Sequence, residues 1–122
     1  MKRTILVVDD ERNIRLLYEK ELREEGYEVL LASDAREALS LLDRTPPDLV
    51  VLDIKMPGMD GIEALGQILA RNNSIPVILN SAYSSYKDSF LSWSADAYVI
   101  KSSDLGELKA RIRSLLAARA EG

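Results

Sequence analysis

The sequence predicts an α/β domain whose doubly wound sheet of five parallel strands, in the order 2-1-3-4-5, is covered by helices on both faces. Five short apolar runs alternate with five stretches of helical spacing, and this alternation is typical of parallel sheets. The runs VVLD and PVIL are almost continuously apolar, as strands buried on both faces are. A chain of 122 residues can bury one substantial core, so we expect a single domain over residues 1–122.

The expected strands are the runs richest in β-branched residues and leucine. They are Thr4–Val8, Tyr27–Leu31, Leu49–Leu52, Pro76–Leu79 and Ala97–Ile100. The first strand is followed by a helical stretch whose inward stripe is Ile14, Leu17, Tyr18 and Leu22. Gly26 stands where a glycine commonly follows the end of a helix.

The next two helical stretches begin at residues that suit a helix N-terminus. Ser33 is a good N-cap for the second stretch, which Pro46-Pro47 ends. Asp60 and Glu63 have the spacing of a capping box at the start of the third. The residues expected to face the core are Ala35, Ala38, Leu39 and Leu42 in the second stretch and Ile62, Leu65, Ile68 and Leu69 in the third.

The fourth and fifth helical stretches differ in how well their residues suit a helix. The fourth, Ser84–Ser94, is rich in serine and has poor helix propensity. Its aromatic residues share one face, which we interpret as core packing: Tyr86, Phe90 and Trp93. The fifth stretch runs from about Leu105 to Ala118, and its inward residues are Leu108, Ile112, Leu115 and Leu116.

Composition excludes several kinds of site. The chain has no cysteine, so disulfides, thiolate chemistry and zinc–thiolate sites are excluded. It has no histidine either, which removes the commonest general base and transition-metal ligand. Any bound metal must therefore be held by oxygen, which favours a hard cation such as Mg²⁺.

Charge and the first residues indicate the cellular setting. The net charge of −4 argues against direct binding of nucleic acid by this domain. The apolar run in MKRTILVVDD meets two aspartates too soon for an export signal, and no later run suits a membrane span. We therefore expect a cytoplasmic protein that does not contact membranes.

Three carboxylates follow two strands that are neighbours in the predicted order. Asp9 and Asp10 come directly after the first strand and Asp53 directly after the third, so the three should meet in the crevice beyond the carboxyl ends of the strands. Two unit charges about 4 Å apart repel by roughly 4 kcal/mol at an effective dielectric near 20. Such a cluster needs a cation or raised pKa values, and Mg²⁺ is the economical solution.

Two further strand ends carry groups that suit a phosphoryl ligand. Ser81 follows the fourth strand and Lys101 the fifth, and a hydroxyl and an ammonium can both stabilise charged phosphoryl oxygens. Each residue also has a purely structural interpretation. Asp10 could cap a helix, Asp53 could be a turn residue at a strand end, Ser81 could be a loop hydroxyl with its hydrogen bonds satisfied, and Lys101 could be a solvated charge. Their joint placement at four strand ends favours a functional site.

Four segments resemble, in order and over nearly the whole chain, the signatures of the receiver domains of bacterial two-component systems. They are VVDDE at 7–11, LVVLDIKMPGMDG at 49–61, PVILNSA at 76–82 and ADAYVIK at 95–101. The resemblance implies a flavodoxin-like fold and phosphorylation of Asp53. It also implies that Asp9, Asp10, Asp53 and the backbone carbonyl of Lys55 bind Mg²⁺, and that Lys101 pairs with the phosphoryl group.

The resemblance also implies a switch. Ser81 matches the switch hydroxyl of the family, and Tyr98 matches the aromatic residue that changes rotamer on activation. Apart from the resemblance, Lys55 and Tyr83 stand two residues after Asp53 and Ser81, where side chains can overhang the phosphoryl group. We predict that they shield it from water and slow its hydrolysis.

The resemblance implies partners as well. A sensor histidine kinase or a phosphotransfer protein would supply the phosphoryl group from a phosphohistidine. The fourth helix, the fifth strand and the fifth helix would then change and act on a downstream protein or a fused output domain, and a phosphorylation-dependent dimer is one form this could take. The chain would be a signalling switch, not an enzyme of turnover, acting alone or within a longer regulator.

One departure from the family pattern lies after the lysine. Ser102 stands where relatives usually have a proline with a cis bond, and a cis bond before a residue other than proline costs about 3–4 kcal/mol. We expect a trans Lys101–Ser102 bond, a re-routed loop, and Ser103 or Asp104 capping the last helix. Ser94 also replaces the usual glycine, so the output face can suit a different partner.

Three alternatives remain open on the sequence. A small-molecule binder of this fold would need a glycine-rich phosphate loop after the first strand, where the chain has DDERN. An aspartyl-phosphate hydrolase would need a second acid two residues after Asp53, where Lys55 stands. A pseudo-receiver would fold alike without being phosphorylated and would act as an interaction module, although the acids and Lys101 speak against it.

Overall fold

The structure is a computed structural model, and it describes residues 2–54, 61–82, 95–102 and 104–121. The predicted fourth helix, Ser84–Ser94, lies outside the described residues, as do Lys55, Asp60 and Tyr83. Within the described part of the chain, no helix has both the length and the apolar composition to cross a membrane.

Five parallel strands form one sheet in the order β2-β1-β3-β4-β5, which confirms the predicted topology. The strands are β1 (Thr4–Val8), β2 (Glu28–Ala32), β3 (Leu49–Asp53), β4 (Val77–Ser81) and β5 (Ala97–Ile100). The predicted β1 and β5 are correct at both ends. The other three strands were wrong by one or two residues: β2 begins and ends one residue later than predicted, and β4 begins one residue later. Asp53 and Ser81 belong to β3 and β4, where they still pair across the sheet.

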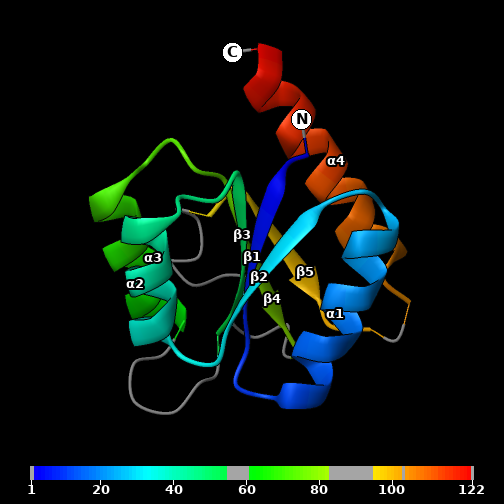
Figure 1. Cartoon of the computed structure of the whole chain (residues 1–122), viewed down its shortest axis with the longest axis horizontal. Coiled ribbons are helices and arrows are strands. Elements are labelled where there is room, and N and C mark those ends of the chain that lie inside the picture. Colours follow the sequence, from blue (N-terminus) through cyan, green and yellow to red (C-terminus); the bar gives the residue numbers. More distant parts are fainter. Residues whose placement is uncertain (1, 55–60, 83–94, 103, 122) are drawn as a thin grey trace.

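Helices cover both faces of this sheet (Figure 1). The described helices are α1 (Arg12–Glu24), α2 (Ala35–Arg44), α3 (Gly61–Arg71) and α4 (Gly106–Glu121), the last being the fifth helical stretch of the sequence. The side chains of α2 and α3 pack into one core cluster, and those of α1 and α4 pack into a second cluster on the other face. Each strand therefore contributes alternate residues to two cores, which explains its continuous apolar sequence.

The predicted inward stripes are largely correct, with one exception in α1. Tyr18 and Leu22 are buried, whereas Leu17 is 39% exposed. Leu17 lies about 100° around the helix from Tyr18 and so falls on the flank of the buried stripe. The buried residues of the other helices include Ala35, Ala38, Leu39 and Leu42 of α2, Leu65 and Ile68 of α3, and Leu108, Ile112 and Leu116 of α4.

The predicted end of α1 is correct, whereas the predicted start of α2 is wrong by one residue. Gly26 follows α1 with φ of 95°, a conformation that suits glycine, and its N–H donates to the carbonyl of Arg23 as expected. For α2 the predicted cap was wrong by one residue. Asp34 is the N-cap, and its carboxylate accepts a 2.8 Å hydrogen bond from the Glu37 N–H, while Glu37 accepts one of 2.7 Å from the Ser33 N–H.

Two aspartates connect neighbouring strands at the amino end of the sheet. Asp48, just before β3, accepts a 2.7 Å hydrogen bond from the N–H of Thr4 and donates its own N–H to the Thr4 carbonyl at 2.8 Å. Asp96, just before β5, does the same with Val77, at 2.8 and 2.9 Å. Both carboxylates therefore satisfy a backbone donor at the first residue of a neighbouring strand.

The loop after β5 follows the predicted course in two respects. No cis peptide bond occurs within the described residues, so the Lys101–Ser102 bond is trans. The Asp104 carboxylate accepts a 2.8 Å hydrogen bond from the N–H of Gly106, the first residue of α4, which confirms Asp104 as a cap. Ser103, the other predicted cap, lies outside the described residues.

Candidate functional site

Three carboxylates meet at the carboxyl end of the sheet, as the sequence predicts. Asp9, Asp10 and Asp53 each offer an oxygen within 4.8 Å of the others. Asp10 is exposed, whereas Asp9 and Asp53 are only 2% and 5% exposed. The register brings them together because Val8 pairs with Leu52, which places the two following aspartates side by side.

Lys101 closes this cluster. Its ammonium lies 2.7 Å from Oδ2 of Asp9 and 3.4 Å from Oδ1 of Asp53. The backbone places it there, since the N–H of Lys101 donates to the carbonyl of Ser81 at 2.7 Å and extends the pairing of β4 and β5. The sequence predicts Lys101 as a partner for a phosphoryl group, and in this structure its partners are the two buried acids.

The electrostatics of the cluster follow from burial. Burial, together with the charge of Asp9, raises the pKa of Asp53 to about 6, in spite of the opposing effect of Lys101. Burial acts to lower the pKa of Lys101, but its hydrogen bond to Asp9 and the charge of Asp53 outweigh that effect and raise it. The ammonium therefore stays charged, and Asp53 is an acid whose ionised form is destabilised.

The first turn of α1 holds Asp9 in place. The N–H of Glu11 donates to Oδ1 of Asp9 at 2.9 Å, and the guanidinium of Arg15 donates to the Asp9 carbonyl at 2.8 Å. The N-cap of α1 is Glu11, whose side chain makes no capping hydrogen bond. The structure thus gives Asp10 no N-cap role, and its carboxylate belongs to the acidic cluster.

The two expected switch residues lie on β4 and β5. Ser81 is the last residue of β4 and is 1% exposed; it stands one position beyond Asn80, the residue that pairs with Asp53. Tyr98 pairs with Leu79, is half-buried, and packs against the core cluster formed by α2 and α3. Their roles as switch residues stay predictions. The metal-binding carbonyl of Lys55 and the shielding side chain of Tyr83 lie outside the described residues.

One buried polar pair, Tyr18 and Asn80, lies beside the acids and was not predicted from the sequence. The amide of Asn80 donates a 2.7 Å hydrogen bond to the hydroxyl of Tyr18, and both residues are 2% exposed. The signal was an asparagine inside the apolar run PVILN, together with a tyrosine on the inward stripe of α1. Buried polar groups require partners, so either residue alone indicated that a second one faced it.

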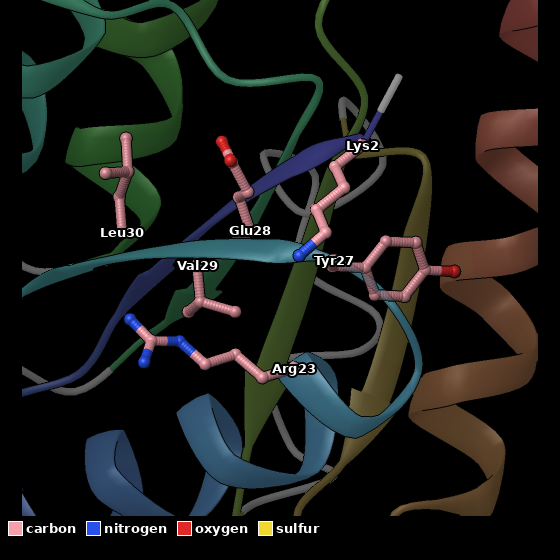
Figure 2. A pocket seen from close by; sticks show the side chains of 6 residues that line it. All are labelled: Lys2, Arg23, Tyr27, Glu28, Val29 and Leu30. Carbon is pink, nitrogen blue, oxygen red and sulfur yellow. The ribbon is translucent and has the colours of Figure 1, made fainter.

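A separate hollow of about 410 Å³ lies at the opposite end of the molecule, against the first residues of the edge strand β2 (Figure 2). Lys2 and Arg23 are the cations that line it, beside Tyr27 and Glu28. Arg23 is already paired with Glu19 at 3.1 Å. The hollow shares no residue with the acidic cluster, and we assign it no function.

Comparison with known proteins decides the family. A model of the response regulator receiver domain matches residues 5–113. The chain belongs to this family. Among curated relatives, the transcriptional regulatory protein PrrA of Mycobacterium leprae is 42% identical over 117 residues, which are 94% of this chain and 50% of that protein. The response regulator MprA of Mycolicibacterium vanbaalenii is 42% identical over 114 residues, 92% of this chain and 49% of that protein.

Solved receiver structures agree with this fold. Response regulator TrrA of Thermotoga maritima, in complex with Mg(2+)-BeF, is 48% identical, with a TM-score of 0.90 over 94% of this chain and 99% of that one. TrrA is also known in complex with the histidine kinase ThkA. A CheY-like receiver of Methanospirillum hungatei is 31% identical, with a TM-score of 0.94 over 99% of this chain and 98% of that one.

The family resemblance stated from the sequence is confirmed, and so are the flavodoxin-like architecture and the signalling class. The acidic cluster of the receiver does not favour the pseudo-receiver alternative. The receiver spans about half the length of the curated relatives it matches.

Proposed function

We propose that Asp53 accepts a phosphoryl group from the phosphohistidine of a sensor histidine kinase or a phosphotransfer protein. The observation that carries the proposal is the buried cluster of Asp9, Asp53 and Lys101 at the carboxyl end of the sheet, with Asp10 at its rim. Further support comes from TrrA, which is 48% identical and was crystallised with Mg(2+)-BeF and with a histidine kinase.

The donor set fits Mg²⁺. Asp9, Asp10 and Asp53 offer carboxylate oxygens that converge within 4.8 Å, and hard divalent cations prefer oxygen ligands. We propose that these residues and the carbonyl of Lys55 hold the ion. Bound there, Mg²⁺ supplies positive charge that offsets the carboxylates and the incoming phosphoryl oxygens.

In the proposed transfer, an ionised Asp53 oxygen forms a bond to phosphorus. The bond from phosphorus to the donor's imidazole nitrogen breaks, and the imidazole keeps the electron pair. Lys101 moves from the Asp53 oxygen to a phosphoryl oxygen, a shift that its flexible stem allows. The Ser81 hydroxyl donates to another phosphoryl oxygen.

We propose that phosphorylation of Asp53 alters the face formed by the predicted fourth helix, β5 and α4, and that a downstream partner binds this face. Movement of Ser81 toward the phosphoryl group leaves space that the half-buried Tyr98 can fill. PrrA is named as a transcriptional regulator, which supports an output through a fused domain or a separate protein. In our proposal the receiver is one cytoplasmic domain over residues 1–122 and does not itself bind nucleic acid. It dimerises on phosphorylation or contacts its partner directly.

Intact-mass analysis with a small phosphodonor tests the acceptor. Wild type incubated with phosphoramidate and Mg²⁺ should gain one phosphoryl adduct, and Asp53→Ala should gain none. Asp43→Ala is the matched control, because Asp43 is exposed and pairs with Arg71 away from the site, and it should be labelled like wild type. A labelled Asp53→Ala protein would refute the assignment, and an unlabelled wild type would favour the pseudo-receiver.

A further inference from the structure

The hydrogen bond between Tyr18 and Asn80 joins the two halves of the phosphoryl site. Tyr18 is on α1, the helix that follows Asp9 and Asp10, and Asn80 is the residue before Ser81 on β4. At 2.7 Å between two residues that are each 2% exposed, the bond fixes the height of β4 against α1. It thereby connects the metal-binding side of the site to the side that carries the switch hydroxyl.

Strand alternation places Asn80 in the same row as the acids. Asp53 pairs with Asn80 in the sheet, and the neighbouring pair Val8 and Leu52 puts Asp9 on the other side of Asp53. Side chains at the same height of parallel strands project from the same face. That face is the one covered by α1 and α4, since Ile78 and Val51, two residues before Asn80 and Asp53, belong to their core cluster.

The hydroxyl of Tyr18 lies within electrostatic reach of the site. Burial raises the pKa of Tyr18 and the hydrogen bond from Asn80 opposes this, while the charges of Lys101, Asp9 and Asp53 act on the same hydroxyl. The Tyr18–Asn80 pair therefore lies next to Asp53 in the sheet, at the border between the acids and the apolar core on this face.

Stability alone does not account for a polar pair at this place. Removing one partner of a buried hydrogen bond leaves a polar group unsatisfied, but replacing both partners by apolar groups can be nearly neutral. The strand residues of the core cluster on this face are apolar, and Asn80 lies at its border with the acids. What the hydrogen bond adds is direction, because it requires a fixed distance and angle that apolar packing does not.

We propose that Tyr18 and Asn80 are positioning residues for phosphoryl transfer. Acting through the backbone of β4, they hold Ser81 at the correct height relative to Asp53. The inference rests on the proposed function of Asp53. Misplacement of reacting groups by about 1 Å can slow a reaction by about a hundredfold, so loss of one anchoring hydrogen bond should slow transfer measurably.

The test compares wild type with four variants: Tyr18→Phe, Asn80→Leu, the double variant, and Tyr27→Phe as a control. Tyr27→Phe removes the same atom from a tyrosine beside the same cluster, away from the acids. For each protein the rate of Asp53 phosphorylation by phosphoramidate is measured at saturating Mg²⁺, at a temperature well below its melting point. The Mg²⁺ dependence of the melting temperature is recorded in parallel.

We expect Tyr18→Phe and Asn80→Leu to slow phosphorylation by about tenfold, with the Mg²⁺ midpoint unchanged, and Tyr27→Phe to match wild type. The double variant should regain stability relative to the single variants and keep the slow rate, because both partners are then apolar. Wild-type rates in the variants, with only their melting temperatures lowered, would show a merely structural pair and overturn the inference. If wild type itself were not phosphorylated, the proposed function would fail, and this inference with it.

Discussion

Aspartates occupy both ends of the sheet in opposite circumstances. At the amino end, Asp48 and Asp96 each accept a hydrogen bond from a backbone N–H of a neighbouring strand. At the carboxyl end, Asp9 and Asp53 lie against each other and share the ammonium of Lys101. The residue type is the same at both ends. Asp48 and Asp96 stabilise the fold, whereas the charges of Asp9 and Asp53 repel each other and destabilise it.

The difference shows where the receiver concentrates charge for function. A carboxylate that satisfies a backbone donor helps the strands to align, whereas clustered carboxylates cost free energy until a cation offsets them. The raised pKa of Asp53, about 6, reports that cost. Four predictions test this contrast, two at the carboxyl end of the sheet and two at its amino end.

The largest effect should be a pH dependence from Asp53. Its pKa rises from an ordinary 3.8 to about 6 on folding, so the native state binds the extra proton between these values. The contribution of Asp53 to the free energy of unfolding should therefore fall as pH rises from about 4 to 6, by on the order of 3 kcal/mol. Urea unfolding without metal measures it, as the difference between wild type and Asp53→Asn. If the difference in free energy of unfolding between wild type and Asp53→Asn did not vary with pH, the pKa of Asp53 would not be raised by folding.

Magnesium should have the next largest effect. Because only the folded state brings the three carboxylates together, Mg²⁺ at a hundred times its dissociation constant should stabilise the receiver by about 2.7 kcal/mol. Asp10→Asn should lose much of this response while its metal-free form is no less stable than wild type. Asp43→Asn, an exposed change elsewhere, should keep the full response in the same thermal melts. Equal responses from both variants would exclude a metal site at Asp10.

At the amino end, loss of a carboxylate should destabilise the fold at every pH where it is ionised. Asp96→Ala leaves the N–H of Val77 without its 2.8 Å acceptor, which should cost about 1–2 kcal/mol. The phosphorylation rate should not change, because the site lies at the other end of the strands. A denaturation midpoint equal to that of wild type would show that water replaces the carboxylate without cost.

The smallest effect should come from removing charge alone at the amino end. Asp48→Asn keeps an oxygen that can accept from Thr4 and loses only the 3.7 Å ion pair with Arg119, in which both side chains are about one-third exposed. We expect a change in the free energy of unfolding of about 0.5 kcal/mol or less. A loss as large as that of Asp96→Ala would mean that charge, and not the hydrogen bond, is what matters there.

The sequence was sufficient for the features set by chain-wide patterns. Apolar runs and helical spacing located the strands and the four described helices, and the strand order brought Asp9, Asp10 and Asp53 together as predicted. Placement at strand ends also brought Lys101 to the acids. These features follow from periodicity and topology, which act over many residues at once.

What the sequence did not predict depends on single contacts between distant elements. Asn80 and Tyr18 are 62 residues apart, and neither shows its partner until α1 is docked on the sheet. The cap of α2 was placed on Ser33 because serine and aspartate suit that position equally, and only the local backbone selects Asp34. Leu17 was placed inward because a stripe alone does not give the rotation of a helix.

The salt bridges of Lys101 also bear on how the receiver persists when metal is scarce. The ammonium is a counterion tethered to the same chain, so its local concentration at Asp9 and Asp53 does not depend on the surrounding solution. Newly made or metal-depleted receivers would therefore keep their acidic end folded, and magnesium would enter by exchange and not into an exposed cluster of negative charge. The lysine that we propose as the partner of the phosphoryl group would then also neutralise Asp9 and Asp53 while no metal is bound.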